Sequence, residues 1–322
     1  MMTTGRRALL AAAGTVLARP TIAQQAWPGR TIRIVVPFAP GGPTDVMARV
    51  VANLLTGPLG QPVIVENRAG GGGNVGTAHV ARAAPDGYTL LVVSTGFVVN
   101  VSLFRNPGYE IREFAPITVL GASPNVILAR PDSGIDSIAA LIARAKATDR
   151  KLDMTNPGTG STPHLTIELL QVRAGVEFVQ VPHNSAGLAI QSLLAGTTQV
   201  GCTALPPAHA QIKAGALRAL AITGEQRWPD LPEVPTMLEL GWQGFVSETF
   251  QGLLAPAGTP PAIIDRLARE TVAGLAEPTT RERLLNAGFG IRAAGPEGLA
   301  QRIAQEVPLW RELIMRAGIE QQ

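Results

Sequence analysis

The sequence has a single cysteine, Cys202, and therefore cannot form a disulfide within the chain. This scarcity is neutral about the cellular compartment, because larger exported proteins often have no disulfide. Aromatic residues make up only 4%, the formal net charge is +3, and lysines and arginines form no long run. A protein that binds nucleic acid along its phosphates needs a basic face. The composition therefore argues against a nucleic-acid partner, and its mild positive charge suits a small anionic ligand.

Catalytic and metal-binding motifs are also missing. Neither Ser94 nor Ser161 has both flanking glycines of a G-x-S-x-G nucleophile elbow. Residues 71–76, GGGNVG, match the dinucleotide pattern G-x-G-x-x-G, but the next predicted strand ends at Ser94 with no acid near it. No H-E-x-x-H or other ligand spacing links the histidines, which are His79, His164, His183 and His209. We therefore predict no catalytic residue, no metal site and no cofactor.

The remaining candidate side chains each have an ordinary alternative. His164 lies in the first turn of a predicted helix, beside a Gly/Ser/Thr loop, so it either contacts a ligand or is satisfied by solvent. His183 stands at a predicted strand end with the same two alternatives, whereas His79 is expected to face solvent. Cys202 also ends a predicted strand, where a cysteine is more often a small packed residue than a reactive thiol.

No segment is long and charge-free enough to span a membrane. The apolar stretch nearest the N-terminus, residues 8–18, is shorter than the roughly 20 residues that a membrane helix needs. Paired Arg6 and Arg7 precede this stretch, and small residues follow it. The layout is typical of a secretory signal of the twin-arginine type. We therefore predict a signal peptide at residues 1–26, cleaved on export, and a periplasmic location; a membrane anchor is the alternative.

The rest of the chain is rich in apolar residues, which make up 46% of the whole and can bury a large core. Short β-branched runs begin at Thr31, Pro62, Tyr88, Asn125, Lys151, Glu177, Gln199 and Leu217. Helical patterns lie between most of them, at residues 44–55, 75–83, 137–147, 163–174, 186–195 and 206–214, and the chain is almost wholly helical after Pro260. Such alternation predicts an α/β fold with mainly parallel sheets flanked by helices.

Parallel sheets bind ligands beyond the carboxyl ends of their strands, and glycines gather at those ends in this sequence. After the first predicted strand, Gly42 is expected to cap a helix that starts with Pro43, with Asp45 in its first turn. The amides of Gly41, Gly42 and Thr44, with the Thr44 hydroxyl, would then form an anion site. The alternative interpretation is an ordinary tight turn.

The same strand-to-helix arrangement recurs at residues 158–164, at Ser94 and Thr95, and at residues 202–206. These strand ends offer N–H and hydroxyl donors without a nucleophile or a base. One helix terminus stabilises an anion by only about 0.3–1 kcal/mol, or up to about 2 kcal/mol when partly buried. Micromolar binding requires about 8 kcal/mol. We therefore expect two sets of donors to close over one anion.

Several segments together carry a family resemblance. They include IRIVVPFAPGGPTDVMARVVANLL from Ile32, GQPVIVENRAGGGGNVGTAHVARAAPDGYTLLV from Gly60, TNPGTGSTPHLTIELL from Thr155 and GLLAPAGTPPAIIDRLARETV from Gly252. From about residue 27 to its C-terminus, the chain resembles the Bug family, the extracytoplasmic solute receptors of tripartite tricarboxylate transporters. The resemblance implies a two-lobed periplasmic binding protein fold that closes on its ligand like a flytrap. It implies a discontinuous lobe 1, of residues 27–105 plus 225–322, and a lobe 2 of residues 106–224.

The resemblance also implies a function and a site. Family members typically bind small carboxylates through backbone amides, hydroxyls and bridging waters, so we expect a monomeric receptor that delivers a small carboxylate to the membrane subunits of a transporter. The alternatives are an exported sensor subunit and, less in keeping with the motifs, an exported α/β hydrolase or lyase. The expected ligand-binding residues are Pro40, Gly41, Gly42, Thr44, Asp45, Ser94, Thr95, Gly158, Thr159, Gly160, Ser161, His164, His183, Cys202, Thr203 and Ala204.

Two segments depart from the family pattern. Residues 181–185 read VPHNS where members often read VPYKG, so a tyrosine and a lysine are lost. Residues 202–207 read CTALPP where many members read FDNLPS, so an acid and an amide are lost. Both segments belong to the second lobe's edge of the expected cleft. The departures therefore bear on which carboxylate is bound.

Overall fold

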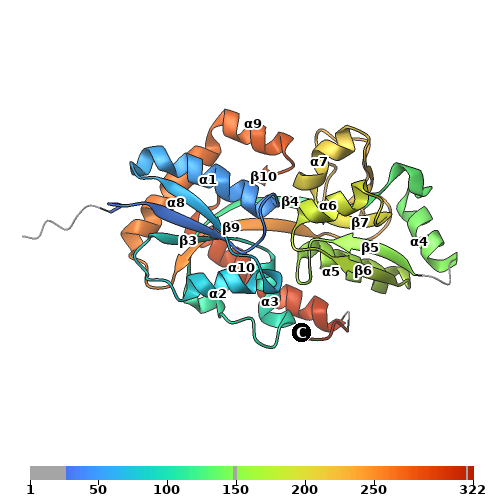
Figure 1. Cartoon of the computed structure of the whole chain (residues 1–322), viewed down its shortest axis with the longest axis horizontal. Helices are drawn as coiled ribbons and strands as arrows, with labels where there is room; N and C mark the ends of the chain where they lie inside the picture. Colours follow the sequence, from blue (N-terminus) through green and yellow to red (C-terminus); the bar gives the residue numbers. More distant parts are fainter. Residues whose placement is uncertain (1–26, 148–150, 317) are drawn as a thin grey trace, which may run out of the picture.

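The computed structural model describes residues 27–147, 151–316 and 318–322, and the predicted signal peptide at residues 1–26 lies outside this part. The described chain forms two lobes side by side, joined by long strands that run between them (Figure 1). Each lobe has strands with helices packed against them, so the prediction of a two-lobed α/β fold is confirmed. None of the described helices combines the length and apolarity that crossing a membrane requires.

The sheet of the first lobe has the strand order β2-β1-β3-β9-β4. Strand β1 pairs in parallel with β2 and β3, whereas β9 runs antiparallel to β3 and β4. These strands are β1 (Ile32–Val36), β2 (Val63–Asn67), β3 (Thr89–Ser94), β9 (Glu248–Pro256), the first part of β4 (Phe114–Ala129) and the short β10 (Gly290–Ile291). The helices are α1 (Pro43–Leu59), α2 (Asn74–Ala81), α3 (Gly96–Leu103), α8 (Pro261–Ala276), α9 (Pro278–Asn286) and α10 (Gly295–Arg316).

Helices cover both faces of this sheet. Ile32 and Ile34 of β1 pack in one apolar cluster with α1 and α8, while Val35 packs in another with α3 and α10. The split follows from strand geometry, because successive side chains point to opposite faces. Since both faces are buried, β1 is a nearly continuous apolar run and not an alternating one.

The second lobe has the strand order β4-β7-β5-β6, and β8 also pairs with β4. Strand β5 is parallel to β6 and β7, whereas β4 runs antiparallel to β7 and β8, so the sheets in both lobes are mixed. The additional strands are β5 (Leu152–Asn156), β6 (Phe178–Pro182), β7 (Val200–Ala204) and β8 (Arg218–Ile222). The helices are α4 (Ile138–Ala147), α5 (Thr162–Ala174), α6 (Ala186–Leu194) and α7 (Leu205–Lys213).

Strand β4 was only partly predicted from the sequence, and strand β9 and helix α3 were absent from the prediction. Strand β4 begins at Phe114 and not at Asn125, and its pairing with β9 shifts register near Pro116 and Gly121, residues that normally interrupt a strand. Strand β9 itself was not predicted. Helix α3, with the sequence GFVVNVSL, is buried along almost its whole length. Its apolar residues therefore show no helical periodicity.

The chain crosses between the lobes within β4 and just before β9. Up to Pro124, β4 pairs with β9, and from Asn125 onward it pairs with β7. Residues 225–247 pack on the second lobe, where Trp228 joins the apolar cluster of Leu128. On these contacts we propose crossings near residues 124–125 and 247–248, in place of the predicted boundaries at 105/106 and 224/225.

Candidate ligand-binding site

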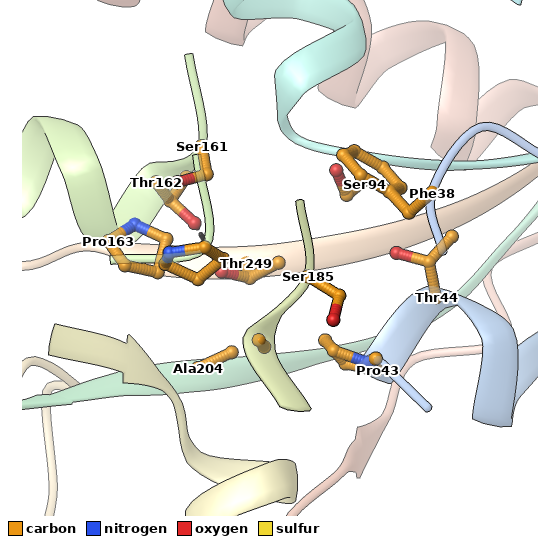
Figure 2. A pocket seen from close by; sticks show the side chains of 13 residues that line it. Phe38, Pro43, Thr44, Ser94, Ser161, Thr162, Pro163, Ser185, Ala204 and Thr249 are labelled. Carbon is orange, nitrogen blue, oxygen red and sulfur yellow. Dashed lines mark hydrogen bonds between the residues drawn. The ribbon is translucent and has the colours of Figure 1, made fainter. Parts of the chain in front are cut away.

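A cavity lies between the two lobes, at the ends of several strands. This first cavity holds about 470 Å³ of empty space, its opening included. Figure 2 shows Thr44 and Ser94 of the first lobe on one side and Ser161 and Thr162 of the second lobe on the other. Its lining consists of Phe38, Gly42, Pro43, Thr44, Ser94, Pro157, Ser161, Thr162, Pro163, Ser185, Ala186, Ala204 and Thr249.

The start of α1 follows the arrangement that the sequence predicts. Gly42 is the N-cap residue, with an extended backbone, and Pro43 opens the helix. The N–H groups of Gly42 and Thr44 have no acceptor within the helix, because the first turn of any α-helix lacks one. Gly42 and Thr44 both line the first cavity, whereas Pro40 and Gly41 do not.

Asp45 stabilises this loop through hydrogen bonds. Its buried carboxylate accepts hydrogen bonds from the Gly41 N–H at 3.1 Å, from Arg49 at 3.0 Å and from Asn67 Nδ2 at 2.9 Å. Burial by itself would raise the pKa of Asp45, but these hydrogen bonds outweigh it and hold the pKa below its ordinary value. The Gly41 amide is thus engaged within the protein, and Asp45 holds the loop in place instead of facing the cavity.

Two more helices start at the first cavity with a hydroxyl cap. Ser161 caps α5, where its Oγ accepts from the His164 N–H at 3.3 Å and donates to Gly158 O at 2.6 Å. Ser185 caps α6, where its Oγ accepts from the Leu188 N–H at 3.3 Å. An N-cap hydroxyl of this kind stabilises a helix by about 1 kcal/mol. These caps fix where each helix points its first N–H groups.

A fourth helix start completes the lining. Ala204 ends β7 and is the N-cap residue of α7, which carries a proline in its first two positions. Four of the described helices, α1, α5, α6 and α7, therefore direct their N-terminal ends at the first cavity, since each N-cap residue lines it. A helix N-terminus carries a partial positive charge and free N–H groups, so it attracts anions. None of the described residues that line the cavity is charged.

Several residues that the sequence predicts for the site lie elsewhere. Thr95 holds β3 against β9, because its Oγ1 donates to Glu248 O at 3.3 Å and accepts from the Phe250 N–H at 2.9 Å. Thr203 donates its hydroxyl to Ala204 O at 2.9 Å. Cys202 is fully buried in the core of the second lobe, and burial raises the pKa of its thiol. None of these three side chains lines the first cavity.

A second cavity adjoins the first and shares Phe38, Pro157 and Ser161 with it. It holds about 830 Å³ of empty space, its opening included. The predicted residues Gly158, Thr159, Ser161 and His183 line it, together with Pro37, Phe38, Ala69, Gly70, Gly71, Gly72, Gly73, Phe104, Pro157, Pro182, Asn184 and Gln322. The sequence-predicted residues that line a cavity are thus divided between two neighbouring cavities.

The lobes touch each other around these cavities. A Cβ on Gly72 of the first lobe would lie 2.8 Å from Thr159 O of the second. A Cβ on Gly288 would lie 3.0 Å from Pro206 Cα, and Gly160 packs directly against Asn100 of the first lobe. Glycine allows two backbones to approach this closely because it has no side chain.

His164 lies in the first turn of α5 but lines neither cavity. Its side chain is 9% exposed, and its Nδ1 has no hydrogen-bond partner among the described residues. Burial lowers the pKa of His164 to about 4, so the imidazole is neutral near pH 7. The sequence predicted that His164 either contacts a ligand or is satisfied by solvent. In the structure it is instead a buried, neutral histidine.

The unfolding free energy is expected to fall in acid because of His164. The unfolded chain binds a proton near pH 6.5, whereas the folded protein resists protonation down to about pH 4. The stability that comes from the neutral His164 is therefore fully present above about pH 6.5. As the pH is lowered from 6.5 to 4, the free energy of unfolding falls by about 3 kcal/mol. Urea unfolding between pH 7 and 4.5 should show a shallower acid loss in His164→Gln than in the parent protein. Equal slopes would contradict the assignment.

Some lining residues were not predicted from the sequence. Ser185 stands between a predicted strand and a predicted helix, so the pattern that located Gly42 and Ser161 also applied to it. Thr249 had no such signal, because β9 was not predicted. Its hydroxyl contacts that of Thr162 and donates to Asn125 Oδ1 at 2.9 Å, which connects β9 to α5 beneath the cavity.

Two lobes that meet over a cavity lined by helix starts define a solute-binding protein. The model of the family described as tripartite tricarboxylate transporter family receptor matches residues 47–319. The chain is 38% identical over 317 residues to Protein BugT of Bordetella pertussis, covering 96% of this chain and 97% of that protein. The structure of the periplasmic binding protein BugD superposes with a TM-score of 0.88 and 39% identity, covering 92% of this chain and 100% of that one.

Another similar structure is that of R. palustris Rpa4515 with adipate, with a TM-score of 0.88, 31% identity and coverage of 91% and 99%. The chain belongs to the tripartite tricarboxylate transporter receptor family, which includes the Bug proteins. It is therefore a solute-binding receptor of that family. The resemblance noted in the sequence is confirmed.

Proposed function

We propose that this protein captures a small carboxylate in the first cavity and delivers it, unchanged, to the membrane subunits of a tripartite tricarboxylate transporter. The observation that supports the proposal best is the convergence of four helix N-termini on a cavity without a charged side chain among its described lining. The adipate in the Rpa4515 structure is a carboxylate in a related receptor. The signal peptide predicted at residues 1–26, and its cleavage, fit this role and stay predictions.

Binding would use donors from both lobes at once. Gly42 and Thr44 offer N–H groups at the start of α1, and Thr162 and Ala186 offer them at the starts of α5 and α6. A carboxylate has two oxygens and accepts several such hydrogen bonds. Because the donors belong to different lobes, the ligand binds the closed arrangement more tightly than an open one and so favours closure.

The first cavity is better suited to holding a ligand than to converting it. Ser94, Ser161 and Ser185 supply hydroxyls, but the described lining contains no histidine, carboxylate or lysine that could remove their protons. The Cys202 thiol is buried, and its raised pKa keeps it protonated. These features support a receptor and disfavour the predicted alternative of a hydrolase or lyase.

A thermal-shift screen tests the carboxylate proposal. The purified protein is unfolded, stripped of co-purified ligand and refolded, and is then heated with mono-, di- and tricarboxylates and with their amides. At a concentration of 100 times its dissociation constant, a ligand adds about 2.7 kcal/mol, so the right acid should raise Tm by roughly 5–10 °C. The amides should give no shift, because a neutral group gains little from the helix dipoles. The proposal would be contradicted if only the amides raised Tm, or if none of the acids raised it.

A further inference from the structure

The two lobes meet at a small contact that includes a buried polar side chain. From the first lobe it contains Gly72 and Asn100, and from the second lobe Thr159 and Gly160, which precede α5. A Cβ on Gly72 would lie 2.8 Å from Thr159 O, and a Cβ on Gly160 would overlap Asn100 Oδ1. These four residues are called the interlobe contact. Its two sides therefore touch directly, with no room for a water molecule between Gly160 and Asn100 Oδ1.

The side chain of Asn100 is oriented entirely by the first lobe. It is 1% exposed, and its Nδ2 donates to Gly72 O at 3.0 Å and to Asn74 Oδ1 at 2.8 Å. Both partners are acceptors, so the nitrogen of the amide must face them and the oxygen must face away. The oxygen is consequently the atom of Asn100 that lies against Gly160 of the second lobe.

This oxygen receives no hydrogen bond. Asn100 Oδ1 is buried and has no donor among the residues that the structure describes. In the same part of the chain, no hydrogen bond joins Gly72 or Asn100 to Thr159 or Gly160. The interlobe contact thus shields Asn100 Oδ1 from water without offering it a new partner.

The cost of this arrangement applies to the closed receptor alone. Because Gly160 belongs to the second lobe, separating the lobes uncovers Asn100 Oδ1 and lets water donate to it. A buried acceptor that has lost its water and gained no partner destabilises the state in which it is buried. We propose that Asn100 Oδ1 opposes closure, so that the ligand-free receptor stays mainly open and closes when a ligand binds. This inference rests on the proposed function and adds the residue that sets the balance between open and closed forms.

The proposal has an unusual consequence for affinity. A ligand that binds the closed form has an apparent dissociation constant that rises as the closed fraction of the free protein falls. Removing Asn100 Oδ1 should therefore tighten binding, whereas a substitution that merely damages a contact between the lobes weakens it. The sign of the change separates the two explanations.

Distance measurements between the lobes test the proposal without any ligand. Spin labels are attached at Val172→Cys on α5 and Leu309→Cys on α10, which are exposed positions in different lobes, and the buried Cys202 stays unlabelled. In the parent protein most molecules should show a label distance longer than that of the present structure. Asn100→Ala should raise the ratio of closed to open molecules about tenfold. A ligand-free parent protein that is mainly closed, or an unchanged ratio in Asn100→Ala, would overturn the proposal.

Asn74→Ala is the matched control. Asn100→Ala also leaves Gly72 O and Asn74 Oδ1 without their donor, and Asn74→Ala disrupts one of these two hydrogen bonds while Asn100 Oδ1 is retained. The control should therefore leave the closed fraction unchanged, and an increase equal to that of Asn100→Ala would contradict the role of the oxygen. If Asn100→Ala does not fold, Asn100→Ser, which also lacks Oδ1, takes its place.

Calorimetric titration completes the test with the acid that raises Tm most in the thermal-shift screen. Asn100→Ala should bind this acid about tenfold more tightly than the parent protein, and Asn74→Ala should bind it no more tightly. Weaker binding by Asn100→Ala would overturn the proposal but leave the proposed function standing. If no acid binds the parent protein, the proposed function fails, while the label distances still decide whether Asn100 opposes closure.

Discussion

Replacing Gly160 with alanine is expected to weaken ligand binding about a hundredfold while both lobes stay folded. In this structure Gly160 of the second lobe packs against Asn100 of the first, and a Cβ at Gly160 would overlap Asn100 Oδ1. Asn100 has little freedom to move, because its buried Nδ2 donates to Gly72 O at 3.0 Å and to Asn74 Oδ1 at 2.8 Å. The added methyl group therefore keeps the lobes from meeting over the ligand.

Gly175 provides the matched control for this variant. Both glycines have positive φ angles, +80° for Gly160 and +61° for Gly175, so alanine is strained at either position. A Cβ at Gly175 meets nothing within 4 Å. Thermal unfolding without ligand should show a similar small loss in both variants, whereas calorimetric titration should show weakened binding in Gly160→Ala alone. Equal affinity in the two variants would show that this contact plays no part in closure.

A series of larger residues at Gly42 is expected to reduce affinity in order of size, from a small effect with alanine to at least a hundredfold loss with leucine. Gly42 lines the first cavity, its φ of −85° suits any residue, and a Cβ there meets nothing within 4 Å. Folding should therefore be retained, while the new side chain occupies space that the carboxylate needs beside the Thr44 N–H. Calorimetric titration and thermal unfolding measure the two effects separately. A leucine variant that binds like the parent would show that the loop is only a turn.

The predictions for Gly160 and Gly42 address different steps. A side chain at Gly42 reduces the space for the ligand within one lobe, whereas a side chain at Gly160 opposes contact between the lobes. Gly42→Leu should therefore bind ligand weakly because the space beside Thr44 in the first lobe is occupied. Gly160→Ala should still bind ligand, weakly, to one lobe. Both outcomes follow from the same requirement, that donors from two lobes act on one anion.

The helix starts that surround the first cavity were largely predictable from the sequence. Capping depends on residues within about four positions of one another, so Gly42 before Pro43, or Ser161 before Pro163, already indicates the local geometry. The strands that alternate with helices can also be recognised in the sequence, because each is a run of β-branched residues. For these elements, local sequence and final structure agree.

The extent of β4 and the existence of β9 were not predictable in the same way. Pro116 and Pro124 interrupt the β pattern. Pro116 is accommodated because β4 shifts register against β9 beside it, and Pro124 lies where β4 changes its partner from β9 to β7. These strands pair across more than a hundred residues of sequence, since Phe114 lies opposite Pro256. Thr249 reaches the first cavity only through this pairing.

The sequence by itself determined the fold class, the family and the strand-to-helix loops that bring N–H groups to the cleft, because these depend on local patterns. Only the tertiary structure decided which donors are free. Asp45 engages the Gly41 amide, β9 engages the Thr95 hydroxyl, and Asn156 engages the amides of Gly158 and His183. A donor that is satisfied by a distant partner within the protein is no longer available to a ligand, and that partner is set by packing and not by neighbours in the chain.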